Sequence, residues 1–497
     1  MRNKKIIFLL MLSLSVIFGG ISRAQDLEER VVEHTFKNGL KVLILERHAS
    51  PTVATSIIYK VGSSDEEEGY TGIAHLLEHM LFKGTKTLGT NDYSKEKPLL
   101  KKIEKTGAAL DNELRKRGGS DRDKIDRLKK GLKQLQEEHK TFIVRNEFSK
   151  IYAASGGTGY NAWTSVDATN YIINLPSNKL ELWAAVESDR MKNHVLREYY
   201  QERDVVMEER RSRFENNPEG TIYEQLIISS FENSPYKHPV IGLEEDLKYL
   251  PKAKVEEFLD RYYLPNNCII SVVGDIEAAE VITLIDKYFG DIRGGEIPKG
   301  RVYKGDIDRG EINRELRLEA NPKIMISYHK PNLPHKDDYV FDVIDSLLTQ
   351  GRTSRLHKRL VLEDKVAVAV SSGTAPGTRY ENLFMIDIVP KEGHSSKEII
   401  AIIEDEIGKL QTHPPTQYEL QKVINNLEAE MIRAMRGNEG IASKLAYYEA
   451  IAGDWRYMVE HINNVRNITP EDIRETAGRY LSRRNRTIVE IVKRGGK

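Results

Sequence analysis

Apolar residues along this chain follow two different spacings, and the spacing predicts where strands and helices form. Residues 31–62 contain two short runs of alternating or continuous apolar residues, with an Asn-Gly turn signal before the first, which predicts two strands. Residues 72–85, GIAHLLEHMLFKGT, instead carry apolar residues at helical spacing, and Thr71 and Gly72 could cap the start of this helix.

Residues 95–148 have a different character. They are dense in charged residues with spaced leucines and isoleucines, and Gly118-Gly119-Ser120 divides them into two parts. This pattern predicts a charged helical hairpin that projects from the domain. A nucleic-acid-binding arm is the alternative, but acidic residues are interleaved throughout. A solvated hairpin, able to contact a partner, is the better interpretation.

The segments after the hairpin return to alternating strands and helices. Residues 161–167 and 171–175 predict two short strands, and residues 198–214 predict a charged helix. Farther on, VEEFLDRYYLPNNCIISVV, starting at Val255, is similar to IRETAGRYLSRRNRTIVEIV, starting at Ile473. This repeat predicts two similar α+β halves, joined by a linker near residues 294–310.

The N-terminal residues indicate export. Residues 1–24 have a basic start, a mostly apolar middle and a Ser-Arg-Ala end, which is the pattern of a secretory signal peptide. A membrane anchor is the alternative, but the apolar run is short of the about 20 residues that a spanning helix needs. No later stretch is long and apolar enough to span. We therefore expect an exported protein, periplasmic or secreted.

Composition argues against two classes of function, nucleic-acid binding and catalysis by a cysteine. Lys plus Arg number 75, Asp plus Glu also number 75, and the formal net charge is zero, which argues against nucleic acid as the main partner. The single cysteine, Cys268, lies in an apolar run that predicts a strand. We expect a buried structural thiol there rather than a nucleophile.

Candidate metal chemistry lies on the helix predicted for residues 72–85. His75 and His79 are four residues apart, so both imidazoles project from one side of a helix and can take two corners of a zinc tetrahedron. Glu78 borders the same face and could act on a water molecule without being a ligand. The alternative is an ordinary pair of surface or core histidines. However, the helix is too apolar for a solvated face, and a buried His-Glu-His cluster would leave polar groups unpaired unless something binds them.

Three stretches together resemble one known family. GIAHLLEHMLFKGT, GYNAWTSVDATNY and ERDVVMEE are similar to the motifs of the pitrilysin (inverzincin) zinc metallopeptidases, in particular the mitochondrial-processing-peptidase-like branch and its bacterial relatives. In that family the last glutamate of E-R-x-x-V-x-x-E is the third zinc ligand. The resemblance therefore implies that Glu209 binds the metal with His75 and His79. It also implies that Glu202 is a catalytic-site carboxylate that supports the metal, whereas Glu208 points elsewhere.

The resemblance covers nearly the whole mature chain and implies its fold and activity. The fold is α+β, with two similar domains, each a sheet covered by helices on one face, and with the hairpin of about residues 95–148 inserted in the first. We expect a zinc-binding peptidase domain at residues 25–297 and a related domain without a zinc motif at residues 298–497. The implied activity is hydrolysis of peptides or unstructured protein segments, with one Zn²⁺ per chain and Glu78 as the general base.

The resemblance also implies where the substrate binds. The strand that contains Asn161, Ala162, Trp163 and Thr164 is the expected edge that pairs with the substrate backbone. Backbone pairing of this kind favours extended peptides over folded proteins.

One departure from the family pattern predicts a protein partner. In many members the second-half domain carries an Arg and, seven residues on, a Tyr that assist the substrate, but the matching positions here are Val361 and Val368. Single-chain members that close over a substrate have four halves, whereas this chain has two. We expect a heterodimer with a related subunit that supplies the Arg and the Tyr. A homodimer could supply the enclosure but not these side chains.

Two other functions stay open at this point. A catalytically silent interaction subunit would keep the fold, but such relatives usually lose motif residues, and His75, Glu78, His79 and Glu209 are all present here. A metal storage or sensor protein would need no glutamate placed as a base.

Overall fold

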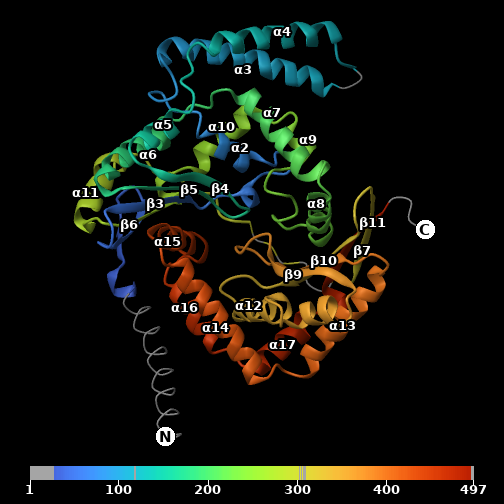
Figure 1. The fold of residues 1–497 in the computed structure, drawn as a ribbon. Coiled ribbons are helices and arrows are strands. Elements are labelled where there is room, and N and C mark those ends of the chain that lie inside the picture. Colours follow the sequence, from blue (N-terminus) through green and yellow to red (C-terminus); the bar gives the residue numbers. More distant parts are fainter. Residues whose placement is uncertain (1–26, 117–118, 302, 304, 306–308, 494–497) are drawn as a thin grey trace.

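Two β-sheets, one from each half of the chain, organise the protein (Figure 1). The computed structural model describes residues 27–116, 119–301, 303, 305 and 309–493. The predicted signal peptide and parts of the predicted linker lie outside these residues. Within the described ranges, no helix combines the length and the apolar character needed to cross a membrane.

The first sheet has six strands. They are β1 (Val32–Thr35), β2 (Lys41–Glu46), β3 (Thr52–Tyr59), β4 (Thr158–Thr164), β5 (Thr169–Pro176) and β6 (Cys268–Gly274). Their spatial order is β1-β2-β6-β3-β5-β4, so β4 forms one edge. β2 pairs parallel with β6, and the other neighbours are antiparallel. The region predicted as two strands holds three, because a short strand precedes the Asn-Gly turn.

The second sheet repeats this arrangement. Its strands are β7 (Ile312–Leu318), β8 (Lys323–Lys330), β9 (Ala367–Ala375), β10 (Asn382–Pro390) and β11 (Arg486–Lys493). Their order is β7-β11-β8-β10-β9, with β7 and β11 parallel and the other pairs antiparallel. Apart from β1, the two sheets therefore have the same order and directions, and β9 is the counterpart of β4. The predicted fold class with two similar halves is confirmed. The boundary between residues 297 and 298 stays a prediction.

Helices surround both sheets (Figure 1). Those before the second sheet are α2 (Ile73–Met80), α3 (Tyr93–Arg115), α4 (Arg122–His139), α5 (Glu147–Ala154), α6 (Leu180–Asn193), α7 (Tyr199–Arg210), α8 (Pro218–Ser230), α9 (Glu244–Leu247), α10 (Lys252–Tyr262) and α11 (Ala278–Phe289). The later ones are α12 (Lys336–Thr349), α13 (Ser396–Thr412), α14 (Gln417–Ala434), α15 (Asn438–Ala452), α16 (Tyr457–Arg466) and α17 (Pro470–Tyr480).

The central strands of each sheet are buried on both faces. Alternate residues of a strand point to opposite faces, and in the first sheet one set packs with α2, α6, α10 and α11 in the main core. The other set, which includes Leu43 and Ile58, packs against α15 from the second half. In return, Ile222 and Leu226 of α8 cover Met325 and Val489 of the second sheet. One helix from each half therefore completes the core of the other half.

The predicted charged hairpin is formed by α3 and α4, which lie side by side (Figure 1). The guanidinium of Arg203 on α7 donates to both carboxylate oxygens of Asp111 on α3, at 2.6 and 2.9 Å. At Gly107 of α3, a Cβ atom would lie 2.1 Å from the ring of Tyr200, so only glycine allows this close approach. The hairpin thus packs closely against α7 and is joined to it by an ion pair.

Candidate metal centre

α2 is held at its start by a buried carboxylate. The Glu66 side chain accepts hydrogen bonds from the backbone N–H of Gly72 at 2.8 Å and of Ala74 at 2.7 Å, which satisfies two amides of the first helical turn. The expected cap by Thr71 is wrong, because its hydroxyl donates to Asp246 at 2.6 Å. Glu66 lies six residues before Gly72, too far back to form a local capping motif, so no sequence pattern indicates its role.

α2 and α7 bring His75, His79 and Glu209 together. Each of these residues offers one nitrogen or oxygen atom that could bind a metal ion, and the three atoms lie within 4.8 Å of one another. In the described part of the chain, this is the one group of this kind. The Nε2 atom of His75 lies 3.7 Å from Oε1 of Glu209, and Nε2 of His79 lies 3.5 Å from Oε2. Arg213, one turn after Glu209, is 2.8 Å from the same carboxylate.

This donor set fits a zinc ion. Ligand atoms about 2 Å from a tetrahedral ion lie roughly 3.3 Å from one another, close to the separations between Glu209 and the two imidazoles. Burial, with His79 and Arg213 nearby, lowers the pKa of His75 to about 3, so its imidazole is neutral and able to bind a cation. Two imidazoles and one carboxylate leave a fourth position for water or substrate.

A second carboxylate orients His79. The Nδ1–H of His79 donates to Oε1 of Glu202 at 2.9 Å, which leaves Nε2 directed at Glu209. Burial opposes the charged form of His79, but Glu202, with Glu209 and Glu78, raises the pKa of His79 overall. The other oxygen of Glu202 lies 2.5 Å from Nζ of Lys83. Despite its burial, Glu202 has a lowered pKa because His79 and Lys83 stabilise its charge.

Glu78 is held by the edge strand of the first sheet. The hydroxyl of Thr164, the last residue of β4, donates to Oε2 of Glu78 at 2.6 Å. Burial raises the pKa of Glu78, and the hydrogen bond from Thr164 opposes this shift. A raised pKa is typical of a carboxylate that exchanges protons near neutral pH.

The other predicted substrate residues follow along β4. Ala162 packs against the main core, on the side of α2. Trp163 faces the other way, and its ring centroid lies 6.5 Å from that of Tyr447 on α15. Asn161 is exposed. The strand therefore presents one face to the helix that carries Glu78 and the other to the second half of the chain.

The remaining predicted positions lie apart from this cluster. Glu208 is mostly exposed and pairs with Arg211. Val361 is partly buried in a helical turn at His357–Glu363, whereas Val368 on β9 is 62% exposed. Sequence reasoning missed Lys83, which contacts the candidate site through Glu202, although it lies in the motif-bearing stretch after His79.

Comparison with known proteins places the chain in a family. The family model described as "Insulinase (Peptidase family M16)" matches residues 41–115, and the one described as "Peptidase M16 inactive domain" matches residues 249–427.

A zinc protease named PqqE from Helicobacter pylori is 26% identical over 498 residues, with 96% of each chain covered. A crystal structure of a protease from Helicobacter pylori has a TM-score of 0.77 at 25% identity, covering 93% of this chain and 99% of that one. The periplasmic protease PqqL from Escherichia coli has a TM-score of 0.68 at 17% identity, covering 93% of this chain but 48% of PqqL. The chain belongs to the M16 family of insulinase-like peptidases.

Proposed function

We propose that this chain is an exported, zinc-dependent endopeptidase that hydrolyses peptides or unstructured protein segments. The observation that carries the proposal is the grouping of His75, His79 and Glu209 beside Glu78. The zinc proteases among its relatives support the same metal, at one ion per chain.

The side chains of this cluster would have different roles in the reaction. When bound, zinc would polarise the scissile carbonyl and make a water molecule more acidic. Glu78 would take a proton from that water and deliver it to the leaving amine. The hydroxyl of Thr164 holds the Glu78 carboxylate in place, and Glu202 holds the ring of His79. Each group is therefore oriented before a substrate arrives.

The substrate would bind along β4. This strand lies at the edge of the first sheet and pairs with β5 on one side, so its other side can accept an extended peptide by strand addition. Because Thr164 is both in β4 and in contact with Glu78, a peptide paired there would pass next to the proposed base. Asn161, Ala162 and Trp163 would contact neighbouring substrate residues.

The active form would be a heterodimer with a related chain. Val361 and Val368 cannot donate hydrogen bonds to a developing oxyanion, and a partner with Arg and Tyr at these positions could. This chain matches about half of PqqL, which supports the expectation that a complete enclosure needs twice its length. We place the assembly in the periplasm or outside the cell, on the basis of residues 1–24 and the periplasmic location of PqqL.

The test is Glu78→Gln in the mature chain, assayed with and without a related chain. Zinc measured by elemental mass spectrometry should stay near one ion per chain. Peptide cleavage should fall at least about a hundredfold, as expected for the loss of a general base. Wild-type protein that binds zinc but cleaves nothing in any combination would favour the silent interaction subunit. Cleavage by Glu78→Gln at the wild-type rate would contradict the proposed role of Glu78.

A further inference from the structure

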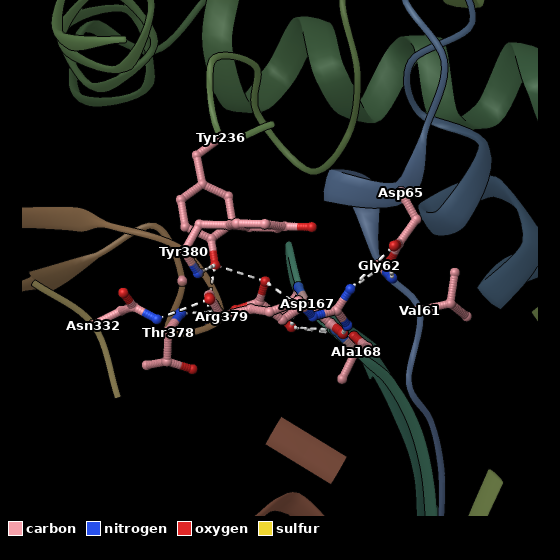
Figure 2. Close-up of polar contacts among 12 residues, drawn as sticks. Val61, Gly62, Asp65, Asp167, Ala168, Tyr236, Asn332, Thr378, Arg379 and Tyr380 are labelled. Carbon is pink, nitrogen blue, oxygen red and sulfur yellow. Dashed lines mark hydrogen bonds and ion pairs between the residues drawn. The ribbon is translucent and has the colours of Figure 1, made fainter. Parts of the chain in front are cut away.

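A loop of the second half places Arg379 against Asp65 and Asp167 of the first half (Figure 2). Residues 376–381 connect β9 to β10. Nη1 of Arg379 donates to both carboxylate oxygens of Asp65, at 3.0 and 3.1 Å, and Nη2 donates to the backbone oxygen of Asp167. One guanidinium therefore joins two segments of the first half that lie far apart in sequence.

The backbone of this loop is fixed as firmly as the side chain. One carboxylate oxygen of Asp167 accepts hydrogen bonds from the N–H groups of Thr378 at 2.7 Å and Arg379 at 3.1 Å. Its other oxygen accepts the hydroxyl of Tyr236 at 2.7 Å, and the Tyr236 oxygen in turn accepts N–H groups of Arg379 and Tyr380 at 2.9 and 3.0 Å (Figure 2). The loop is thus held by a closed network rather than by one ion pair.

Packing in this contact is close as well. A Cβ atom at Gly377 would lie 2.4 Å from a methyl group of Val166, 2.5 Å from the Asp167 carboxylate and 2.6 Å from the Tyr236 hydroxyl. Only glycine allows the loop to approach this closely.

Both segments held by Arg379 lead directly to the proposed site. Asp65 precedes Glu66, the carboxylate that holds the first turn of α2. Asp167 comes three residues after Thr164, whose hydroxyl holds Glu78. The two segments also pair with each other, since the N–H of Ser64 donates to the backbone oxygen of Val166 at 2.8 Å.

We propose that Arg379 is a positioning residue, through which the second half fixes the metal-binding helix and the general base relative to each other. It acts through Asp65 and Glu66 on α2, and through Asp167 and Thr164 on Glu78. The inference rests on the proposed zinc-peptidase function for its consequences on catalysis. Its structural part, that α2 depends on a residue of the other half, does not.

The charges explain why the contact would be sensitive to substitution. The side chains of Asp65 and Asp167 are 10% and 4% exposed, so their carboxylates depend on partners rather than on water. Burial raises the pKa of Asp65, and Arg379 opposes that shift. Removing one partner of a buried ion pair leaves an uncompensated charge, which is strongly destabilising locally.

The chain offers a matched control for Arg379. Lys41 on β2 forms an ion pair with Glu449 on α15 at 2.7 Å, and this pair also joins the two halves. The side chains of Lys41 and Arg379 are similarly exposed, at 24% and 23%. Lys41, however, is not in contact with the segments that hold α2 or Glu78. Arg379→Met and Lys41→Met therefore each remove one charged side chain that joins the halves, and only the first should disturb the site.

Three measurements on the full mature chain test the proposal. In the metal-free protein, hydrogen exchange of the amides of α2 should be faster in Arg379→Met than in wild type or Lys41→Met. Zinc affinity, measured by chelator competition, should fall in Arg379→Met alone, by about 5- to 150-fold, the usual range for coupled sites. In active preparations, kcat should fall more than KM changes. Arg379→Lys should recover part of the loss, since it keeps the charge but not the two-pronged geometry.

Equal exchange and equal zinc affinity in Arg379→Met and Lys41→Met would overturn the proposal. If Arg379→Met does not fold, Arg379→Lys is compared with Lys41→Arg in the same assays. Faster exchange and weaker zinc binding in Arg379→Lys alone would support the proposal, and equal values in the two variants would overturn it. Failure of the proposed function is separable, because wild-type protein without zinc binding would refute the peptidase while the exchange experiment still decides the role of Arg379.

Discussion

The ring of His79 and the carboxylate of Glu202 form a hydrogen bond of 2.9 Å between α2 and α7. This bond fixes which ring nitrogen of His79 faces Glu209. We expect Glu202→Ala to weaken zinc binding by about 10- to 100-fold, the usual cost of losing a residue that orients a metal ligand. Chelator competition measures this, with Glu208→Ala on the same helix as the control. An unchanged affinity in Glu202→Ala would rule out the orienting role.

Glu209 should differ sharply from its neighbour Glu208. Only the former lies near both imidazoles, while the latter is exposed beside Arg211. Glu209→Ala should lose most bound zinc, because two imidazoles alone hold the ion weakly, and Glu208→Ala should keep it. Elemental analysis after dialysis decides between them. The reverse result would mean that the ligand is one position away.

The acid limb of the pH profile should depend on Thr164. Glu78 acts as a base only when deprotonated, and the hydrogen bond from Thr164 lowers its pKa against the effect of burial. Thr164→Val removes that bond, so the pKa of Glu78 should rise further and the acid limb of kcat/KM should move to higher pH. Thr164→Ser, which keeps the hydroxyl, should leave the limb in place. A shift to lower pH in the valine variant would contradict the assignment.

Activity should depend on a related chain that supplies Arg and Tyr. We expect cleavage to rise when this chain is mixed with such a relative, and the mass in solution to correspond to one copy of each. The matched control is the same relative with both residues replaced by valine, which should associate but stimulate much less. Full activity of this chain as an isolated monomer would refute the heterodimer.

The sequence predicted the features that depend on local pattern. Helical spacing placed His75 and His79 on one helix, and the similarity of the segments at Val255 and Ile473 predicted two related halves. The structure has α10 followed by β6 and α17 followed by β11 at these places, and the two sheets share one strand order.

Features that depend on contacts between distant residues were not predictable. Glu66 holds α2 through two backbone amides, but nothing in its surrounding sequence distinguishes it from other acidic residues. Arg379 meets Asp65 across more than half of the chain. The sequence carries no spacing rule for such pairs, because their separation is set by the path of the whole fold.

The exchange of α8 and α15 between the halves has a consequence for any attempt to divide the protein. A cut in the segment between α11 and β7 would leave two fragments that still share both helices, so the nicked protein should run as one species until it is denatured. Either fragment expressed alone would expose an apolar sheet face such as that formed by Leu43 and Ile58, and should aggregate.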